Sequence, residues 1–248
     1  MGRLDNKVII VTGAAGGMGE AYARKFVEEG AKVILADINE EKGNAIADEL
    51  GENATFVKLD VRNKDQWENA VRTAEEKYGY VTGLMNNAAI DGNPEKLIEE
   101  VTREEYDEMF DINVYGVFLG MQAVVESMKK NKSGSIVNVS STAGVNSSKW
   151  DAAIYVGSKF AVTGLSKAAA VEFGKYNIRV NSLHPGAIAT PMLAEVGPEV
   201  IETINAETAL NRTGKTEEIA NIGVFLMSDE STYSTGAEFM VDGGLLLK

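Results

Sequence analysis

The chain has 248 residues, 44% of them hydrophobic, and its 24 basic and 37 acidic side chains give a formal net charge of −13. This length fits one domain with a large core, and the acidic balance disfavours nucleic acid and anionic membranes as partners, because both need a basic surface. The absence of cysteine excludes disulfides and thiolate metal sites, and a single histidine is too few for a zinc site, so we expect no metal.

The chain also lacks a segment expected to enter a membrane. No apolar run approaches the roughly 18–20 residues that span a bilayer. The first residues lead directly into a strand-like segment and lack the pattern of a signal peptide. We therefore expect a cytoplasmic protein.

Short apolar segments alternate with amphipathic ones along the chain. The expected strands are Val8–Thr12, Lys32–Asp37, Thr55–Leu59, Gly83–Asn86, Ser135–Ser140, Arg179–His184 and Glu238–Val241. The expected helices are Gly17–Glu29, Glu40–Leu50, Lys64–Tyr78, Arg103–Lys129, Ala153–Tyr176 and Thr216–Met227. Most of the strands lack polar alternation, as in strands covered on both faces. The pattern predicts a single α/β domain over residues 1–248, with a doubly wound parallel sheet flanked by helices.

The first expected strand leads into a Gly-rich turn and then a helix. The turn reads Thr12-Gly13-Ala14-Ala15-Gly16-Gly17-Met18-Gly19. Glycines allow the backbone to approach a pyrophosphate, which lies against the N–H groups at the helix N-terminus. The Gly-x-Gly-x-x-Gly fingerprint is not matched, because Tyr22 occupies its last position. The turn alone therefore only suggests a dinucleotide site.

Asp37 strengthens this interpretation. It ends the second expected strand, 18 residues after Gly19, where a carboxylate can hydrogen-bond the ribose hydroxyls of a dinucleotide. The same charge would repel the 2′-phosphate of NADP, and neither residues 13–19 nor Ile38 supply a basic side chain. The sequence favours NAD. Asp37 could alternatively, or also, cap the helix that opens near Asn39.

The expected helix 153–176 carries Tyr155 and Lys159, one turn apart on one face. A lysine charge there favours the phenolate and lowers the pKa of the tyrosine. Lowering it from about 10 toward 7 takes about 4 kcal/mol, and such a phenol can exchange a proton with a substrate oxygen near neutral pH. Tyr-x-x-x-Lys alone more often marks a solvated helix face, but only one of the eight tyrosines has a lysine at this spacing.

His184 directly precedes Pro185, and we interpret it as structural. A Ser-His-Asp hydrolase would need His184 as its base, but the chain has no Gly-x-Ser-x-Gly motif. The following segment, residues 190–207, interrupts the alternation of strands and helices. It carries apolar residues every four positions, at Met192, Val196, Val200 and Ile204. We expect a short helix or helix pair that either packs ordinarily or forms a lid over a substrate.

With these residues identified, the chain closely resembles the short-chain dehydrogenase/reductase family over practically its whole length. The motifs that carry the resemblance are Thr12-Gly13-x-x-x-Gly17-x-Gly19, Asp60-Val61, Asn86-Asn87-Ala88, Asn113, Ser140-Ser141, Tyr155-x-x-x-Lys159, Asn181, Pro185-Gly186, Thr190 and Val241-Asp242-Gly243-Gly244. The resemblance implies a seven-stranded parallel Rossmann sheet and a homotetramer whose main dimer interface uses the helices matching 103–129 and 153–176. Among bacterial members, it is most similar to hydroxysteroid and alicyclic alcohol dehydrogenases.

The resemblance also implies roles for individual residues. The catalytic set would be Asn113, Ser141, Tyr155 and Lys159, with Ser141 binding the substrate oxygen and Asn113 holding a water that connects Lys159 to solvent. The cofactor-binding set would be Gly13, Gly16, Gly17, Met18, Gly19, Asp37, Ile38, Asp60, Val61, Asn87, Ala88, Ala89, Tyr155, Lys159, Pro185, Gly186, Ile188, Thr190 and Met192. The substrate would lie against Ser141, Val145, Trp150, Tyr155, Ala187, Met192, Leu193 and Val196.

Two departures from the family pattern concern this site. Ala89 stands where a glycine is usual, and its methyl group disfavours a positive φ. Ser141 lies 14 residues before Tyr155, one more than is common. Strict counting would select Thr142, but the motif Val139-Ser140-Ser141-Thr142-Ala143-Gly144 aligns better with Ser141 as the catalytic serine.

These inferences together predict an NAD-dependent oxidoreductase that interconverts a secondary alcohol and a ketone. The expected substrate wall is mainly apolar, which suits a hydrophobic small molecule such as a hydroxysteroid or cyclic alcohol. One alternative is a 3-oxoacyl-carrier-protein reductase, against which Asp37 and the acidic charge both weigh. An alternative of another class is a non-catalytic dinucleotide-sensing protein, which would have no need of the tyrosine, lysine and serine.

Overall fold

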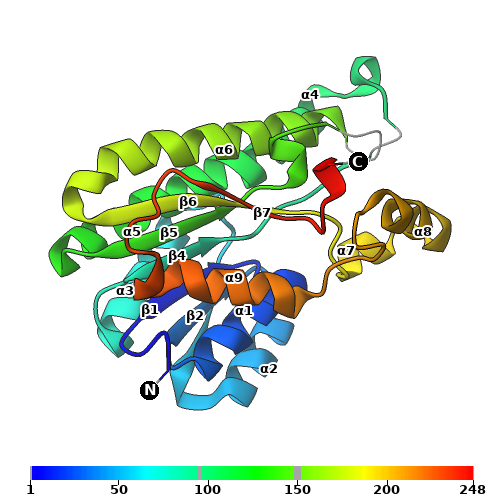
Figure 1. Ribbon diagram of the computed structural model, residues 1–248. Helices are drawn as coiled ribbons and strands as arrows, with labels where there is room; N and C mark the ends of the chain where they lie inside the picture. Colours follow the sequence, from blue (N-terminus) through cyan, green and yellow to red (C-terminus); the bar gives the residue numbers. More distant parts are fainter. Residues whose placement is uncertain (1, 94–95, 148–151, 248) are drawn as a thin grey trace.

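A seven-stranded parallel sheet organises the protein (Figure 1). The computed structural model describes residues 2–93, 96–147 and 152–247. The strands are β1 (Val8–Thr12), β2 (Lys32–Asp37), β3 (Ala54–Lys58), β4 (Gly83–Asn86), β5 (Gly134–Val139), β6 (Ile178–Pro185) and β7 (Glu238–Val241). They pair in the order β3-β2-β1-β4-β5-β6-β7, and every pair is parallel. The predicted doubly wound Rossmann architecture is confirmed, and the predicted strands differ by at most one residue at each end.

The helices also follow the predicted order. They are α1 (Gly17–Glu28), α2 (Glu40–Leu50), α3 (Lys64–Tyr78), α4 (Arg103–Phe110), α5 (Gly116–Asn131), α6 (Ala153–Phe173), α7 (Pro191–Ala194), α8 (Pro198–Glu207) and α9 (Thr216–Met227). The prediction of one regular helix over Arg103–Lys129 was wrong, because a π-helical turn (η3, Asp111–Tyr115) joins α4 to α5. A 3-10 turn over Gly174–Tyr176 replaces the predicted end of α6.

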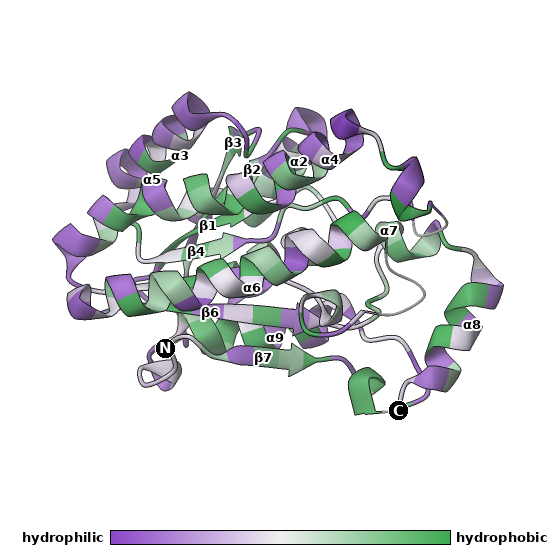
Figure 2. Cartoon of the chain, turned by 90° about the horizontal axis from the view of Figure 1, so that it is seen from above, coloured by the Kyte–Doolittle hydropathy of each residue, from purple (hydrophilic) through white to green (hydrophobic). Residues whose placement is uncertain are grey.

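Two hydrophobic layers enclose the sheet, which explains why the strands lack polar alternation. On one face, Ile9 and Val11 of β1 pack in a cluster with side chains of α1, α2 and α9. On the other face, Val8 and Ile10 pack in a cluster with side chains of α3, α5 and α6. Every residue of β1 is buried. Figure 2 shows hydrophobic and hydrophilic residues mixed along α3 and α8, as expected for helices with one outer face.

The strand order reverses at β1, which lies between β2 and β4. Ligands of such sheets bind outside the carboxyl ends of the strands at this point. The segments that follow β1, β4, β5 and β6 all leave the same edge of the sheet, at the right in Figure 1, where α7 and α8 also lie. The fold therefore gathers the predicted motifs at one edge. Within the described residues, no helix combines the length and apolar character needed to cross a membrane.

Candidate active site

The Gly-rich turn between β1 and α1 has the shape that a pyrophosphate requires. Gly13 has a φ of +64°, which favours glycine. A Cβ atom on Gly19 would lie 1.9 Å from the carbonyl oxygen of Gly13, so the helix packs too close to the turn for any side chain. A Cβ atom on Gly16 would meet no protein atom within 4 Å. The open space at Gly16, next to the N-terminus of α1, fits a bound dinucleotide.

The residues after β4 tie that strand to the turn. The Thr12 hydroxyl oxygen accepts hydrogen bonds from the backbone N–H groups of Asn87 (2.9 Å) and Ala88 (3.0 Å), and the Asn87 side-chain amide donates to the Thr12 carbonyl (2.9 Å). The side-chain oxygen of Asn87 is buried without a hydrogen-bond partner. A buried acceptor of this kind is rare in native proteins, and a ligand in the cleft would supply a donor. Ala89 has no positive φ, so its methyl group creates no strain of that kind.

Asp37, at the end of β2, is fixed beside the turn. Its carboxylate accepts hydrogen bonds from the backbone N–H groups of Ala15 and Asn39, each at 2.9 Å. The alternative role of Asp37 as a helix cap is wrong, because Asn39 caps α2 by accepting from the Lys42 N–H. The next residue, Ile38, is exposed. The Asp37 carboxylate, which could hydrogen-bond the ribose of a bound dinucleotide, is therefore held in place.

Asp60 and Val61, which follow β3, are held by two residues that the sequence did not single out. Arg62 donates through Nε and Nη2 to the Asp60 carboxylate, and these hydrogen bonds hold the pKa of Asp60 below its usual range. The Trp67 indole N–H donates to the Val61 carbonyl at 2.9 Å. Both predicted adenine-binding residues thus have a defined position.

Tyr155 and Lys159 lie in the first two turns of α6, as their spacing predicts. The Lys159 ammonium nitrogen is 5.5 Å from the centre of the Tyr155 ring and donates to the Val139 carbonyl at the end of β5 (3.0 Å). Lys159 is only 3% exposed, and burial lowers the pKa of its ammonium group to about 8. The lysine is therefore mostly charged at pH 7, and the alternative of a solvated helix face does not hold for it.

Ser141 lies in the turn that follows β5. Its hydroxyl oxygen accepts a hydrogen bond from the Ala143 N–H at 3.1 Å. Ser141 thereby caps the 3-10 turn Thr142–Gly144. The preceding residue, Ser140, is buried and hydrogen-bonds the Lys159 carbonyl at 3.0 Å. We call residues 140–144 the serine turn, and this hydrogen bond joins it directly to Lys159.

Asn113 lies in the π-helical turn η3 and is buried. Its side chain donates to the Ile90 carbonyl (2.8 Å) and to the Ser158 hydroxyl (3.1 Å), and accepts from the Ile90 N–H (2.9 Å). Ser158 in turn donates to the Tyr155 carbonyl at 2.7 Å. The side chain of Asn113 therefore braces the start of α6 through Ser158.

The loop after β6 faces the Gly-rich turn. A Cβ atom on Gly17 would lie 3.6 Å from the Thr190 methyl carbon. Thr190 caps α7 by accepting from the Leu193 N–H, while Ile188 is buried. The structure therefore brings two predicted cofactor-binding segments together, although they are far apart in the sequence.

The predicted substrate wall is in part open to solvent. Val145, Met192 and Val196 are 39%, 43% and 36% exposed. Ala187 and Leu193 are half-buried, and Trp150 lies outside the described residues. Residues 190–207 form the helix pair α7 and α8, one of the predicted forms. A hollow of about 110 Å³ nearby is lined partly by Ile90, Met109 and Ala152–Ile154, which sequence reasoning missed.

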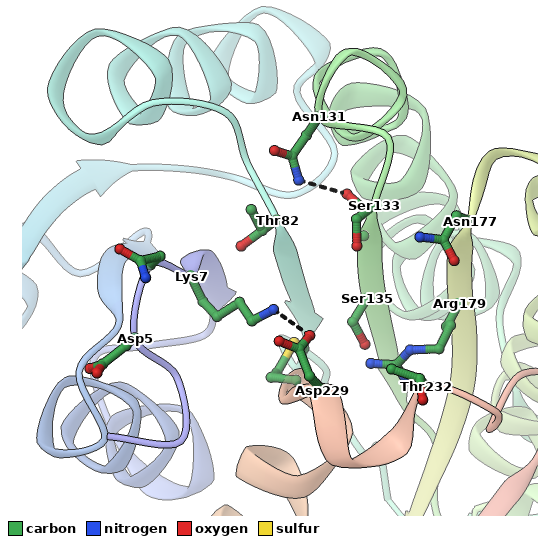
Figure 3. A pocket seen from close by; sticks show the side chains of 13 residues that line it. Asp5, Lys7, Thr82, Asn131, Ser133, Ser135, Asn177, Arg179, Asp229 and Thr232 are labelled. Atoms are coloured by element: carbon green, nitrogen blue, oxygen red, sulfur yellow. Dashed lines mark hydrogen bonds and ion pairs between the residues drawn. The ribbon is translucent and has the colours of Figure 1, made fainter. Parts of the chain in front are cut away.

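A cavity of about 360 Å³ lies at the opposite edge of the sheet (Figure 3). Its lining includes residues at the amino ends of the strands, among them Lys7, Thr82, Ser135 and Arg179. The Lys7 ammonium group is paired with Asp229 at 2.6 Å. The catalytic candidates lie at the carboxyl ends, so this cavity is separate from the candidate active site. Among the described residues, no group of three or more His, Asp or Glu side chains could hold a metal.

Comparison with known proteins identifies a matching family model and several relatives of this chain. A family model described as Enoyl-(Acyl carrier protein) reductase matches residues 13–246. A 3-alpha-(or 20-beta)-hydroxysteroid dehydrogenase of Mycobacterium tuberculosis is 46% identical over 243 residues, which cover 98% of this chain and 90% of the relative. A cyclopentanol dehydrogenase of Comamonas testosteroni is 42% identical, covering 98% of both chains. A trans-4-hydroxycyclohexanecarboxylate dehydrogenase of Sinomonas cyclohexanicum is 39% identical, covering 98% of this chain and 93% of the relative.

Proposed function

Because the chain belongs to the short-chain dehydrogenase/reductase family and is an oxidoreductase acting on CH–OH groups, we propose that it is an NAD-dependent dehydrogenase of a hydrophobic cyclic alcohol. It would interconvert a secondary alcohol, such as a hydroxysteroid or an alicyclic alcohol, and the matching ketone. The observation that carries the proposal is the buried Lys159 ammonium group beside the Tyr155 ring. The names of the three relatives reported above denote dehydrogenases of ring-bearing alcohols, which supports the substrate class.

Tyr155 would exchange the proton of the reaction. In alcohol oxidation its phenolate accepts the hydroxyl proton, and in ketone reduction its phenol returns that proton to the oxygen. The positive charge of Lys159 favours the phenolate, and the hydrogen bond to the Val139 carbonyl keeps the ammonium group near the ring.

Ser141 and Asn113 would complete the catalytic set. The Ser141 hydroxyl oxygen accepts from the Ala143 N–H, which leaves its hydrogen to donate to the substrate oxygen as negative charge develops there. The side chain of Asn113 fixes the start of α6 through Ser158. As the resemblance implies, Asn113 would also hold a water that connects Lys159 to solvent.

The cofactor would bind across the carboxyl edge of the sheet. The bound nicotinamide ring would take the hydride from the carbinol carbon or give it to the ketone. The Gly13–Gly19 turn would hold the pyrophosphate, Asp37 the ribose hydroxyls, and Asp60 with Val61 the adenine. Thr190 and the Ile188 backbone would hold the carboxamide. The fixed Asp37 carboxylate supports NAD over NADP, because it would repel a 2′-phosphate.

The remaining predictions concern assembly and access. We propose that residues 1–248 form one domain, that α7 and α8 act as a substrate lid, and that the protein is a homotetramer. The exposed aromatic side chains of Phe118 on α5 and Phe160 on α6, 41% and 47% exposed, support an interface on these helices. A cytoplasmic location also stays a prediction.

A substrate screen tests the proposal. Hydroxysteroids, cyclopentanol and cyclohexanol derivatives, and linear alcohols would each be supplied with NAD and with NADP. Thioesters of 3-oxoacyl groups would be supplied with NADH and with NADPH, and the reduced cofactor would be followed by its absorbance in every case. We expect turnover of cyclic alcohols with NAD. Activity confined to 3-oxoacyl thioesters with NADPH would instead favour the carrier-protein reductase, which the relatives' names do not favour. Dinucleotide binding without any turnover would favour a sensor.

A further inference from the structure

The single histidine of the chain is buried directly behind the serine turn. His184, in β6, has no exposed surface. Its Nδ1 atom lies 2.8 Å from the Ser141 carbonyl oxygen, and its Nε2 atom lies 2.8 Å from the Ser182 hydroxyl oxygen. The interpretation of His184 as structural correctly places it in the core. It leaves open why a polar ring lies against the proposed catalytic serine.

The partners of the ring define its tautomer. A carbonyl oxygen can only accept a hydrogen bond, so Nδ1 must carry the hydrogen that is donated to Ser141. In a neutral imidazole, Nε2 is then the acceptor, and the Ser182 hydroxyl donates to it. The alternative acceptor for that hydroxyl, the Ala237 carbonyl, is 3.5 Å away. In a neutral ring, both polar atoms are thus satisfied only as the Nδ1–H tautomer.

Charged groups around the ring do not change this assignment. The Glu238 carboxylate lies 4.0 Å from Nε2 and favours the charged ring, while Lys159 and Lys167 disfavour it. Burial is the largest effect and lowers the pKa of His184 below its ordinary value. The ring is therefore neutral near pH 7.

Ser141 depends on this contact for its position. Its backbone is extended, with φ −165° and ψ 166°. The two ends of the residue are held separately: the Ala143 N–H holds the hydroxyl oxygen, while the carbonyl oxygen accepts from the Gly144 N–H (2.9 Å) and from the His184 ring (2.8 Å). Without the ring, only the Gly144 N–H within the same turn holds this carbonyl, so the turn is no longer tied to β6 and can shift together with the Ser141 hydroxyl. A shift of about 1 Å in a catalytic group can reduce a rate about 100-fold.

We propose that His184 is a positioning residue, whose Nδ1–H fixes the Ser141 carbonyl and thereby aims the Ser141 hydroxyl at the substrate oxygen. The inference rests on the proposed function, since it assigns to His184 a part in that same reaction. It places no proton transfer on the ring.

Two substitutions distinguish the roles of the two ring nitrogens of His184. In His184→Asn the amide nitrogen can occupy the place of Nδ1 and keep the bond to Ser141. In His184→Gln the amide can occupy the place of Nε2, which keeps Ser182 and loses Ser141. We expect His184→Gln to lower kcat at least about tenfold with little change in KM, and His184→Asn to retain more activity. Equal kcat in both variants, or the reverse order after correction for the folded fraction, would overturn the proposal.

A double-mutant cycle tests whether His184 acts through Ser141. In a Ser141→Ala background the hydroxyl is gone, so His184→Gln should cause little further loss of kcat in single-turnover measurements. If the two losses multiply, the ring acts independently of Ser141 and the proposal is wrong.

Nuclear magnetic resonance supplies a test that needs neither activity nor a variant. Because the chain has one histidine, ¹⁵N-histidine labelling gives one pair of ring nitrogen signals. We expect a protonated Nδ1 and an unprotonated Nε2 at neutral pH. An Nε2–H tautomer would contradict the inference. A wild-type enzyme that has the Nδ1–H tautomer but turns over no alcohol would instead contradict the proposed function. The two failures are therefore distinguishable.

Discussion

Asn113 and Ile90 pair through two hydrogen bonds, although 23 residues separate them. The side-chain amide of Asn113 donates to the Ile90 carbonyl and accepts from the Ile90 N–H, as a neighbouring strand would. The π-helical turn makes this possible. The Gly116 N–H donates to the Asp111 carbonyl five residues back, so one extra residue fits into the turn and Asn113 faces the loop after β4.

Replacing Asn113 should therefore cost stability. Asn113→Leu removes the partner of two backbone groups, and we expect the free energy of unfolding to fall by about 3 kcal/mol, because each unsatisfied buried group costs about 1–3 kcal/mol. Urea denaturation measures the change. The control is Asn44→Leu in α2, where the asparagine is exposed and the change should stay within about 0.5 kcal/mol. Similar losses in both variants would show that the pairing with Ile90 contributes little.

The π-helical turn marks a limit of prediction from sequence. The apolar spacing of residues 103–129 is that of one helix, and the amide partner of Asn113 lies in a loop that periodicity does not place. The same holds for His184, whose contact with Ser141 joins β6 to the turn after β5. By contrast, β1, β2 and α2 were predicted at their observed ends, because the short apolar runs of the strands and the amphipathic pattern of the helix are local signals.

Some of the site residues could likewise be located from the sequence, and others could not. The Gly13–Gly19 turn, Asp37 and the Tyr155–Lys159 pair could be located from spacing, since each acts within one element or at its end. Arg62 and Trp67 could not, because they act on Asp60 and Val61 through side-chain contacts that have no fixed spacing.

The buried Lys159 should make stability depend on pH. Its pKa is about 8 in the folded protein and 10.5 when unfolded, so between these values the unfolded chain binds more protons. Folding stability must then rise with pH in this window, and below it the penalty for the buried charge is fully present. Relative to Lys159→Met, wild type should gain about 2 kcal/mol from about pH 7 to about pH 9.5. Urea denaturation of both proteins at the two pH values measures the gain. A difference that does not change with pH would show that the ammonium group is not penalised by burial.

Asp37 should control the choice of dinucleotide. Asp37→Asn removes the charge and keeps an oxygen that can accept from Ala15 or Asn39. We expect the ratio of kcat/KM for NAD over NADP to fall at least about tenfold, a change of 1.4 kcal/mol, because the repulsion of the 2′-phosphate is lost. Asp48→Asn removes the same charge from an exposed position on α2 and should leave the ratio unchanged. An unchanged ratio in the Asp37 variant would remove the argument for NAD.

Two glycine variants should locate the pyrophosphate. Gly16 has an extended backbone and no protein atom near its would-be Cβ, so Gly16→Ala should change the free energy of unfolding by less than about 0.5 kcal/mol. It should nevertheless weaken dinucleotide binding, because the methyl group enters the cofactor's space. Gly19→Ala should lower both the free energy of unfolding and the affinity for the dinucleotide, since its methyl group meets the Gly13 carbonyl. Calorimetric titration measures binding, and full affinity in Gly16→Ala would place the cofactor elsewhere.

The most direct test is the initial rate of NADH formation from a cyclic secondary alcohol, with wild type and Tyr155→Phe compared at saturating NAD. Removing the phenolic oxygen should lower kcat about 10²- to 10⁴-fold, the usual contribution of a general acid or base. Tyr233→Phe, at a fully exposed tyrosine, should match wild type. If Tyr155→Phe also turns over at the wild-type rate, Tyr155 is not the group that exchanges the substrate's proton.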